Sequence, residues 1–157
     1  MIGRMARANL ILEESDYVEW YSELGPLFAG IPRLREYYYL LSDLELNRYP
    51  DTLRKGEDPI LISGEELSTT LEQIEVQFIW GVLSAFERIP TSLPVEAPYA
   101  EGNTAFWEGQ PTPQAQGASF EIVCWDSSLT LFIGVDQWLA SWLRKLYPDI
   151  RDLRNGG

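Results

Sequence analysis

Histidine is absent from this 157-residue sequence, and cysteine occurs only once, as Cys124. The lack of histidine removes the usual Ser-His-Asp and Cys-His nucleophile pairs and every metal site that uses histidine. A single cysteine excludes a cysteine-rich zinc cluster and an internal disulfide, and its place in the apolar run 120–125 predicts a packing role. The glycine motifs of phosphate-binding loops, dinucleotide sites and serine esterases are also missing. We therefore expect no enzyme activity, no metal and no cofactor.

Long hydrophobic runs are missing too. No apolar stretch approaches the roughly 20 residues that a helix needs to cross a bilayer, and residues 1–12 carry no export signal. These features predict a soluble, cytoplasmic protein without membrane contacts. Apolar residues still make up 45% of the chain, with six Trp, eight Tyr and six Phe, which is enough for the core of one domain spanning 1–157.

Basic residues are scarce in the middle of the chain. The net charge is −12, and residues 57–143 hold thirteen acidic residues against one base, Arg88. Nucleic-acid binding through phosphate neutralisation needs clustered Lys and Arg, so direct binding to DNA or RNA is not expected. A basic protein partner suits this distribution better, although an acidic surface also serves solubility alone.

Local patterns predict the helices. Tyr17, Trp20, Tyr21 and Leu24 recur at helical spacing, which predicts an amphipathic helix that ends at Gly25-Pro26. A capping box at 63–66 predicts a second helix to about Gln73. The third is predicted after Asp136, with its apolar face made by Trp138, Leu139, Trp142, Leu143 and Leu146.

Alternating and β-branched runs predict the strands. They cover 9–12, 36–46, 60–62 and 76–86, and a hairpin of 120–125 with 129–134 around a polar turn. The 36–46 strand is apolar on both sides, which predicts burial of both its faces. The fold class predicted is therefore α+β, a single domain with a mostly antiparallel sheet of five or six strands and about three packed helices.

Residues 89–118 are rich in proline and glycine and predict a long irregular segment. They include Pro90, Pro94, Pro98, Pro111 and Pro113, which a helix interior or central strand excludes. Structureless stretches of this length are uncommon in compact domains and are usually functional or disordered. The segment also carries Tyr99, Phe106 and Trp107.

A carboxylate hydrolase, such as a glycosidase-like enzyme, remains an alternative, because two acids about 5–10 Å apart can cleave a glycosidic bond. Glu101, Trp107 and Glu108, with Asp126 from the hairpin turn, would form its cleft. A self-associating structural or regulatory subunit is a further alternative, since the aromatic content allows a homo-oligomer. For Asp126 we weigh a structural role in the turn against a functional one.

The segment FEIVCWDSSLTLFIGVDQWLASWLRKLYPDIRDL, residues 120–153, is similar to the C-terminal ends of bacterial immunity proteins of polymorphic and contact-dependent toxin systems. The resemblance rests on a strand-turn-strand-helix pattern around Trp125-Asp126-Ser127-Ser128. It implies tight one-to-one binding to a toxin domain, often through acidic residues, and transfers no contact position.

Together these observations predict an immunity-type toxin inhibitor, which binds a cognate toxin, a nuclease domain with a basic surface, and occludes its active site or substrate groove. The candidate partner-binding residues combine acids and aromatic anchors on the long segment with acids elsewhere. They are Glu96, Tyr99, Glu101, Trp107 and Glu108, with Glu57, Asp58 and Asp126 as secondary candidates.

Overall fold

Seven antiparallel strands form one sheet, in the order β3-β2-β4-β5-β6-β1-β7. The structure is a computed structural model that describes residues 7–20, 22–93 and 96–153. The strands are β1 (Ala8–Leu12), β2 (Tyr38–Leu46), β3 (Ile60–Ser63), β4 (Phe78–Phe86), β5 (Phe120–Trp125), β6 (Leu129–Val135) and β7 (Arg151–Asp152). The helices are α1 (Gly25–Gly30), α2 (Gly64–Gln73) and α3 (Gln137–Leu146), with short 3-10 turns η1 (Pro32–Glu36) and η2 (Thr104–Trp107). The predicted α+β class with an antiparallel sheet is confirmed.

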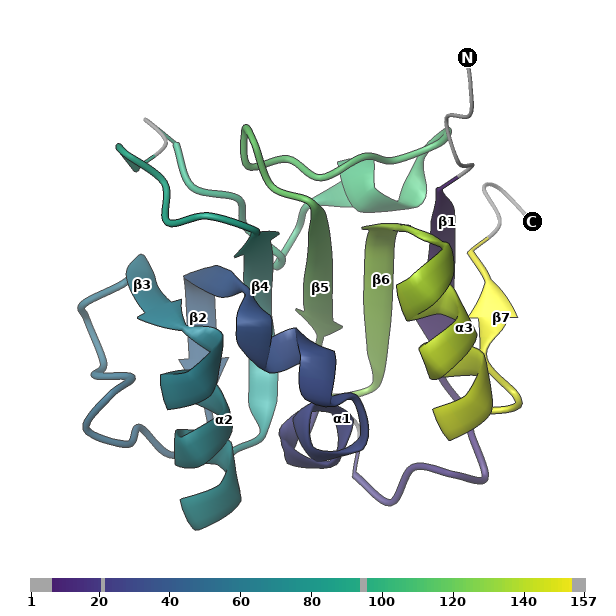
Figure 1. Ribbon diagram of the computed structural model, residues 1–157, viewed down its shortest axis with the longest axis horizontal. Helices are drawn as coiled ribbons and strands as arrows, with labels where there is room; N and C mark the ends of the chain where they lie inside the picture. The colour runs from purple at the N-terminus through teal and green to yellow at the C-terminus, as the bar shows by residue number, and fades with distance from the viewer. Residues whose placement is uncertain (1–6, 21, 94–95, 154–157) are drawn as a thin grey trace.

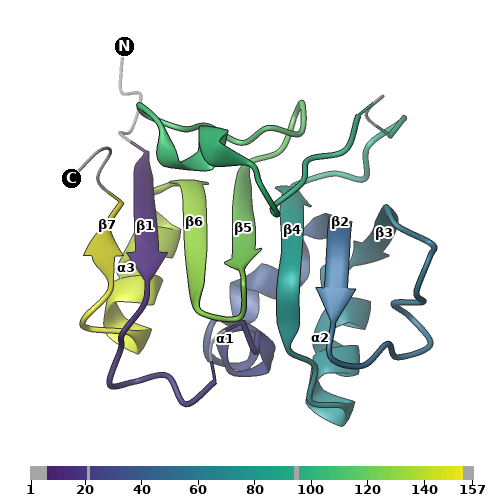
Figure 2. The same cartoon turned by 180° about the vertical axis from the view of Figure 1, so that it is seen from behind.

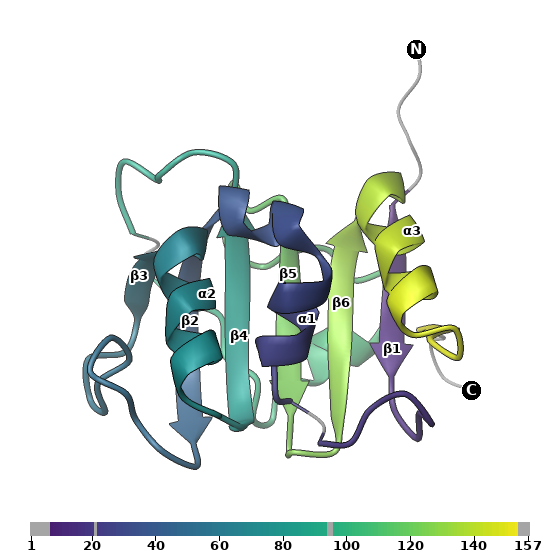
Figure 3. The ribbon, with the colours of Figure 1, turned by 60° about the horizontal axis from the view of Figure 1, so that its bottom comes forward.

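All three α-helices cover the same face of the sheet (Figure 1 and Figure 3). Their apolar side chains pack on inward-facing residues of the strands, and together they form the main core. Leu67 and Leu71 contribute from α2, and Leu139 and Leu143 from α3, all of them buried. Burial of this kind is the dominant favourable term in folding, so the helix face fixes the frame on which the rest is built.

The long irregular segment, described at residues 87–93 and 96–119, runs along the upper end of the sheet, on the side away from the helices (Figure 2). Ala100 and Phe106 from this segment pack on Val82, Val123 and Leu131 of the sheet. A further small cluster joins Ala115 to Leu40 and Phe86. Strands β5 and β6, and β4 from Gly81 onward, are therefore buried on both faces. The burial predicted for 36–46 holds only in part, because β2 begins at Tyr38 and is buried at 39–42 and at Leu46 but exposed at Glu45. The predicted irregular character of the long segment is confirmed, and η2 is its one short turn of helix among the described residues.

Two predicted helix starts are confirmed with their caps. The Ser63 hydroxyl accepts a hydrogen bond from the Glu66 N–H at 3.1 Å, and α2 ends at Gln73 as expected. The Asp136 carboxylate accepts one from the Leu139 N–H at 3.4 Å. Each side chain satisfies one of the amides that the first helical turn leaves without an internal partner.

The amphipathic helix expected around Tyr17 and Trp20 is wrong. Residues 13–20 form turns and bends, and Glu14 and Ser22 have positive φ angles of 50° and 64°, which a right-handed helix does not contain. Tyr17 and Trp20, expected to face a core, are 58% and 62% exposed. Tyr21 and Pro94, also used in the predictions, lie outside the described residues.

Gly25-Pro26 starts a helix instead of ending one. Pro26 occupies the first turn of α1, where its missing N–H is not needed and its fixed φ angle suits the helix. The apolar face predicted for α3 is wrong at Trp142, which is 42% exposed, while Leu139 and Leu143 are buried as expected. Among the described residues, no helix has the length and apolar character needed to cross a membrane.

Candidate functional site

An acidic groove lies beside the β2–β4 pair, on the side of the sheet that the long segment covers. It encloses about 480 Å³. Its lining comes from β2, from the segment after β2, from β4 and from the long segment, and consists of Asp43, Leu44, Glu45, Leu46, Tyr49, Lys55, Trp80 and Glu101. Three carboxylates thus meet two aromatic rings and one base in one concave surface, which we call the acidic groove.

A bulge in β2 forms one wall of the groove. The pairing with β4 shifts register between Ser42 and Glu45, and Asp43 has a positive φ angle of 54°. A bulge leaves backbone amides without strand partners. The Asp58 carboxylate accepts both of them, from the Asp43 N–H at 3.1 Å and from the Leu44 N–H at 2.6 Å. Asp58, predicted as a partner contact, therefore builds the wall.

Asp43 connects this wall to the long segment. Its Oδ2 accepts hydrogen bonds from the Ala100 N–H at 2.8 Å and the Glu101 N–H at 3.0 Å. One residue earlier, the Ser42 hydroxyl donates to the Pro98 carbonyl at 2.6 Å. These three bonds hold the backbone of the segment against β2, and they position Glu101 at the groove.

Trp80 belongs to a row of three indole rings. Its ring meets that of Trp125 edge-on, with centroids 5.0 Å apart, and Trp125 meets Trp107 in the same way at 5.3 Å. Such edge-to-face pairs add to the stabilisation that burial provides. In the β2–β4 ladder Trp80 is the partner of Glu45. Of the three rings Trp80 lines the groove, and its edge-to-face contact with Trp125 connects that lining to the rest of the row.

A second carboxylate fastens the long segment farther up the sheet. Glu121 on β5 is fully buried, and its oxygens accept hydrogen bonds from the Gln114 N–H at 2.6 Å and the Ala115 N–H at 2.8 Å. Burial raises the pKa of the Glu121 carboxyl, while these two amides and the Ser84 hydroxyl counteract the rise. Sequence reasoning missed this role, although an acid inside the apolar run 120–125 was its signal.

The structure gathers three of the predicted contacts around Asp43. Glu101 lines the groove, Asp58 supports its wall, and Tyr99, 52% exposed, immediately precedes the tethered Ala100. Sequence reasoning did not select the other lining residues, because a bulge and a loop from fifty residues away bring them together. These missed residues include Asp43, Glu45, Tyr49 and Trp80.

The remaining predicted contacts lie outside the groove lining. Glu57 and Glu96 are exposed, and Glu108 is exposed at the end of η2. Trp107 is half-buried in the indole row. Asp126 is exposed in the three-residue β5–β6 turn, 126–128, where it and Ser127 have positive φ angles and the Ser128 N–H donates to the Trp125 carbonyl at 3.0 Å.

Two observations concern the cysteine and the grouping of acidic side chains in the described residues. Cys124 is fully buried, and burial raises the pKa of its thiol to about 12, far above the range of reactive cysteines. Within the ranges 7–20, 22–93 and 96–153, no group of three or more acidic or cysteine side chains is arranged to hold a metal ion. Comparisons with protein-family models, with curated proteins and with solved structures return no match to this chain.

Proposed function

We propose that this chain is an immunity-type binding protein, which neutralises a cognate bacterial toxin by covering a basic surface of the toxin's nuclease domain. The observation that carries the proposal is the acidic groove, whose lining holds three carboxylates and two aromatic rings against one base, Lys55. A nuclease active site or substrate groove carries the positive charge that binds phosphates. The acidic groove offers the opposite charge on a concave surface.

The groove supplies both charged and aromatic side chains, the two kinds of group that a tight contact with a basic protein needs. Carboxylates steer a basic partner toward the surface and accept hydrogen bonds from Lys and Arg side chains. Aromatic rings supply the apolar contact area that dominates binding energy at interface centres, and Arg in particular stacks on indole and phenol rings. Tyr49 and Trp80 provide these rings in the groove, where the chain's own Lys55 Nζ lies 5.7 Å from the centroid of the Tyr49 ring. Tyr99, just before the tethered Ala100, is exposed as well.

A carboxylate hydrolase is the second candidate, because the groove brings three carboxylates and a tryptophan together. A general acid needs a carboxyl whose pKa is raised. Glu23 and Glu121, whose pKa values burial raises, lie outside the groove lining. Asp43 is engaged by two backbone amides and serves to hold the long segment. These contacts favour the binding function over catalysis.

The first test is a growth assay in a laboratory bacterium. The C-terminal domain of the protein encoded next to this chain is expressed with and without the chain, and the proposal expects killing by that domain and rescue by the chain. A neighbour that kills equally in the presence of the chain contradicts the pairing.

Charge reversal then locates the contact. We expect the double variant Glu45→Lys/Glu101→Lys to weaken binding to the purified toxin domain by about tenfold or more, measured by isothermal titration calorimetry at low salt. The matched control is Glu72→Lys/Glu87→Lys, which makes the same charge change at exposed positions away from the groove. Equal loss in both pairs would mean that only net charge matters, and the groove assignment would then be wrong.

A further inference from the structure

The segment between β1 and α1 presents two large aromatic side chains to solvent on an anchored backbone. Trp20 is 62% exposed and Tyr17 58% exposed. The Ser15 hydroxyl donates to the Asp149 carboxylate at 2.6 Å, and the Asp16 N–H donates to the same carboxylate at 2.9 Å. Two strong bonds thus fix the start of this segment near the C-terminal end of the described chain.

The end of the segment is fixed as well. The Ser22 carbonyl accepts a hydrogen bond from the Phe78 N–H at 2.9 Å, and Glu23 forms an isolated antiparallel bridge with Gln77. These contacts attach the segment to the beginning of β4. The two exposed rings are therefore displayed from a stretch of backbone that is held at both ends.

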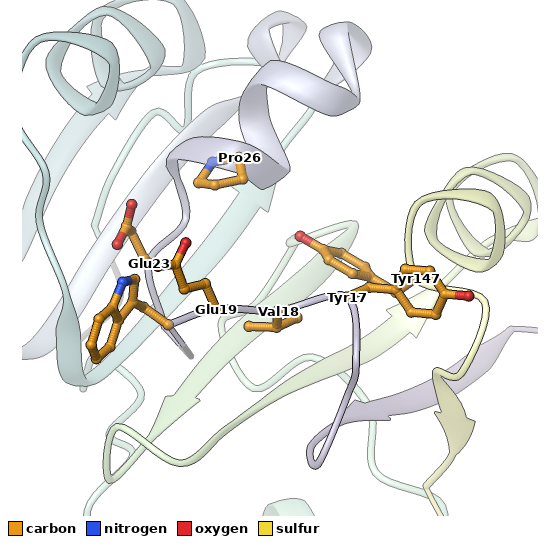
Figure 4. Close-up of a pocket in the computed structure, with 7 residues that line it drawn as sticks. Tyr17, Val18, Glu19, Glu23, Pro26 and Tyr147 are labelled. Atoms are coloured by element: carbon orange, nitrogen blue, oxygen red, sulfur yellow. The ribbon is translucent and has the colours of Figure 1, made fainter.

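A small pocket lies at this segment. It encloses about 100 Å³ and is lined by Tyr17, Val18, Glu19, Trp20, Glu23, Pro26 and Tyr147. Figure 4 shows the Glu19 and Glu23 side chains close together, with Pro26 beyond them and Tyr17 and Tyr147 across Val18. The volume suits the end of a single side chain. We call this site the Tyr17–Trp20 pocket.

The electrostatics of the pocket select a cation. Glu19 and Glu23 line it, and the described lining contains no base. Partial burial, then the nearby carboxylates of Glu75 and Glu19, raise the pKa of Glu23. Because like charges are held close together, a positive group placed between them would relieve their repulsion. The aromatic rings that line the same pocket favour a cation through a second, independent interaction, the cation–π attraction.

We propose that the Tyr17–Trp20 pocket binds a lysine or arginine side chain from a basic segment of a partner protein. The alkyl stem of that side chain packs on the Tyr17 and Trp20 rings, and its charged end meets Glu19 and Glu23. The pocket would be a second contact surface for the proposed toxin domain, and only the identity of the partner rests on the proposed function. The chemistry of the pocket can be tested without that partner.

Two other occupants fit less well. A second copy of the chain, docked by two-fold symmetry through this surface, would place the Glu19 and Glu23 carboxylates of both copies near one another. An anionic lipid surface would meet the same repulsion. Charge complementarity therefore favours a basic protein segment.

The test titrates the isotope-labelled chain with a short capped peptide of alternating Lys and Gly, then with an Arg-Gly version, and follows the indole N–H of Trp20 by NMR. The variant Trp20→Phe assigns that signal. We expect a saturable shift at Trp20, and a dissociation constant raised about threefold or more in Glu19→Gln/Glu23→Gln. The matched control, Glu65→Gln/Glu72→Gln on the exposed side of α2, should bind like the unmodified chain.

An unchanged Trp20 signal, or a shift that survives in Glu19→Gln/Glu23→Gln, overturns the pocket assignment. A peptide of alternating Glu and Gly should leave the signal in place, and a shift with it would likewise contradict a cation site. Failure of the growth assay with peptide binding intact would remove the proposed function alone. Rescue in the growth assay without a Trp20 shift would remove this inference alone.

Discussion

The Ser84 hydroxyl donates a hydrogen bond to the Glu121 carboxylate at 2.7 Å, directly across the β4–β5 pair. Both side chains are fully buried. The same carboxylate also receives the backbone N–H groups of Gln114 and Ala115. A polar side chain inside the sheet thus binds the long segment that covers it, and all its partners are supplied by the fold.

The buried Glu121 makes stability depend on pH. Its pKa in the folded chain is raised above the ordinary value of 4.5, so its protonated form is favoured by folding. The protonated Glu121 carboxyl therefore contributes to the stability of the folded chain fully at pH values below its pKa in the unfolded chain. This contribution is lost as pH rises through its pKa in the folded chain. The measurement is urea unfolding of the unmodified chain and of Glu121→Gln from about pH 4 to about pH 8. We expect the free energy of unfolding of the unmodified chain, minus that of Glu121→Gln, to fall as pH rises. A constant difference would contradict this.

Asp58 should contribute more to stability than Glu57, although both side chains are exposed, because only the Asp58 carboxylate accepts the amides of the β2 bulge among the bonds shown. In Asp58→Ala the amides of Asp43 and Leu44 lose their acceptor, so we expect a loss of about 1–2 kcal/mol in the free energy of unfolding. Glu57→Ala, the control, should change it by less than about 0.5 kcal/mol. Denaturant titration of both variants measures the difference, and equal effects would show that the β2 bulge does not depend on this carboxylate.

Gly134 and Gly102 separate the cost of backbone strain from the cost of crowding. Both have positive φ angles, of 70° and 81°. A Cβ at 134 would lie 2.7 Å from Pro113 Cδ, whereas one at 102 meets nothing within 4 Å. We expect Gly102→Ala to cost about 1 kcal/mol and Gly134→Ala about 3 kcal/mol, measured by thermal unfolding. Equal costs would mean that the long segment moves away from β6 freely.

Cys124 should be inert in the folded chain. Burial raises the pKa of its thiol to about 12 and closes it to reagents. We expect a thiol-reactive dye to label the chain only in denaturant, with a rate in native buffer set by unfolding. Mass spectrometry measures the labelling. Fast labelling of the native chain would show that the thiol is accessible, and a nucleophilic role for Cys124 would then have to be considered.

Short-range signals made part of the fold predictable from sequence. The Ser63 capping box and the polar turn at 126–128 specify their own local geometry, so α2 and the β5–β6 hairpin appear where they were predicted. The segment around Tyr17 shows the opposite case. Helical spacing of aromatic residues predicts a helix only if a core receives them, and here the backbone is instead bonded to Asp149 and to β4.

The candidate site was less predictable for a related reason. Glu101 was selected from sequence because it lies on the irregular segment, but its position depends on Asp43, more than fifty residues earlier. The bulge at Asp43 gives no local signal in an apolar strand. Trp80 reads in the sequence as an ordinary strand residue, and only the pairing with β2 places it beside Glu45. Long-range pairing determines which carboxylates share a surface.

The described edges of the sheet are short, with four residues in β3 and two in β7. A long exposed edge is a template on which another chain can add a strand, in normal recognition or in fibril growth. β3 and β7 themselves therefore offer few backbone groups for such pairing, and the part of β2 that β3 leaves uncovered, residues 42–46, contains the bulge, a feature that turns an edge away from another strand. Concentrated solutions of this protein should therefore resist amyloid-like assembly, even though its strands are among the most apolar parts of the chain.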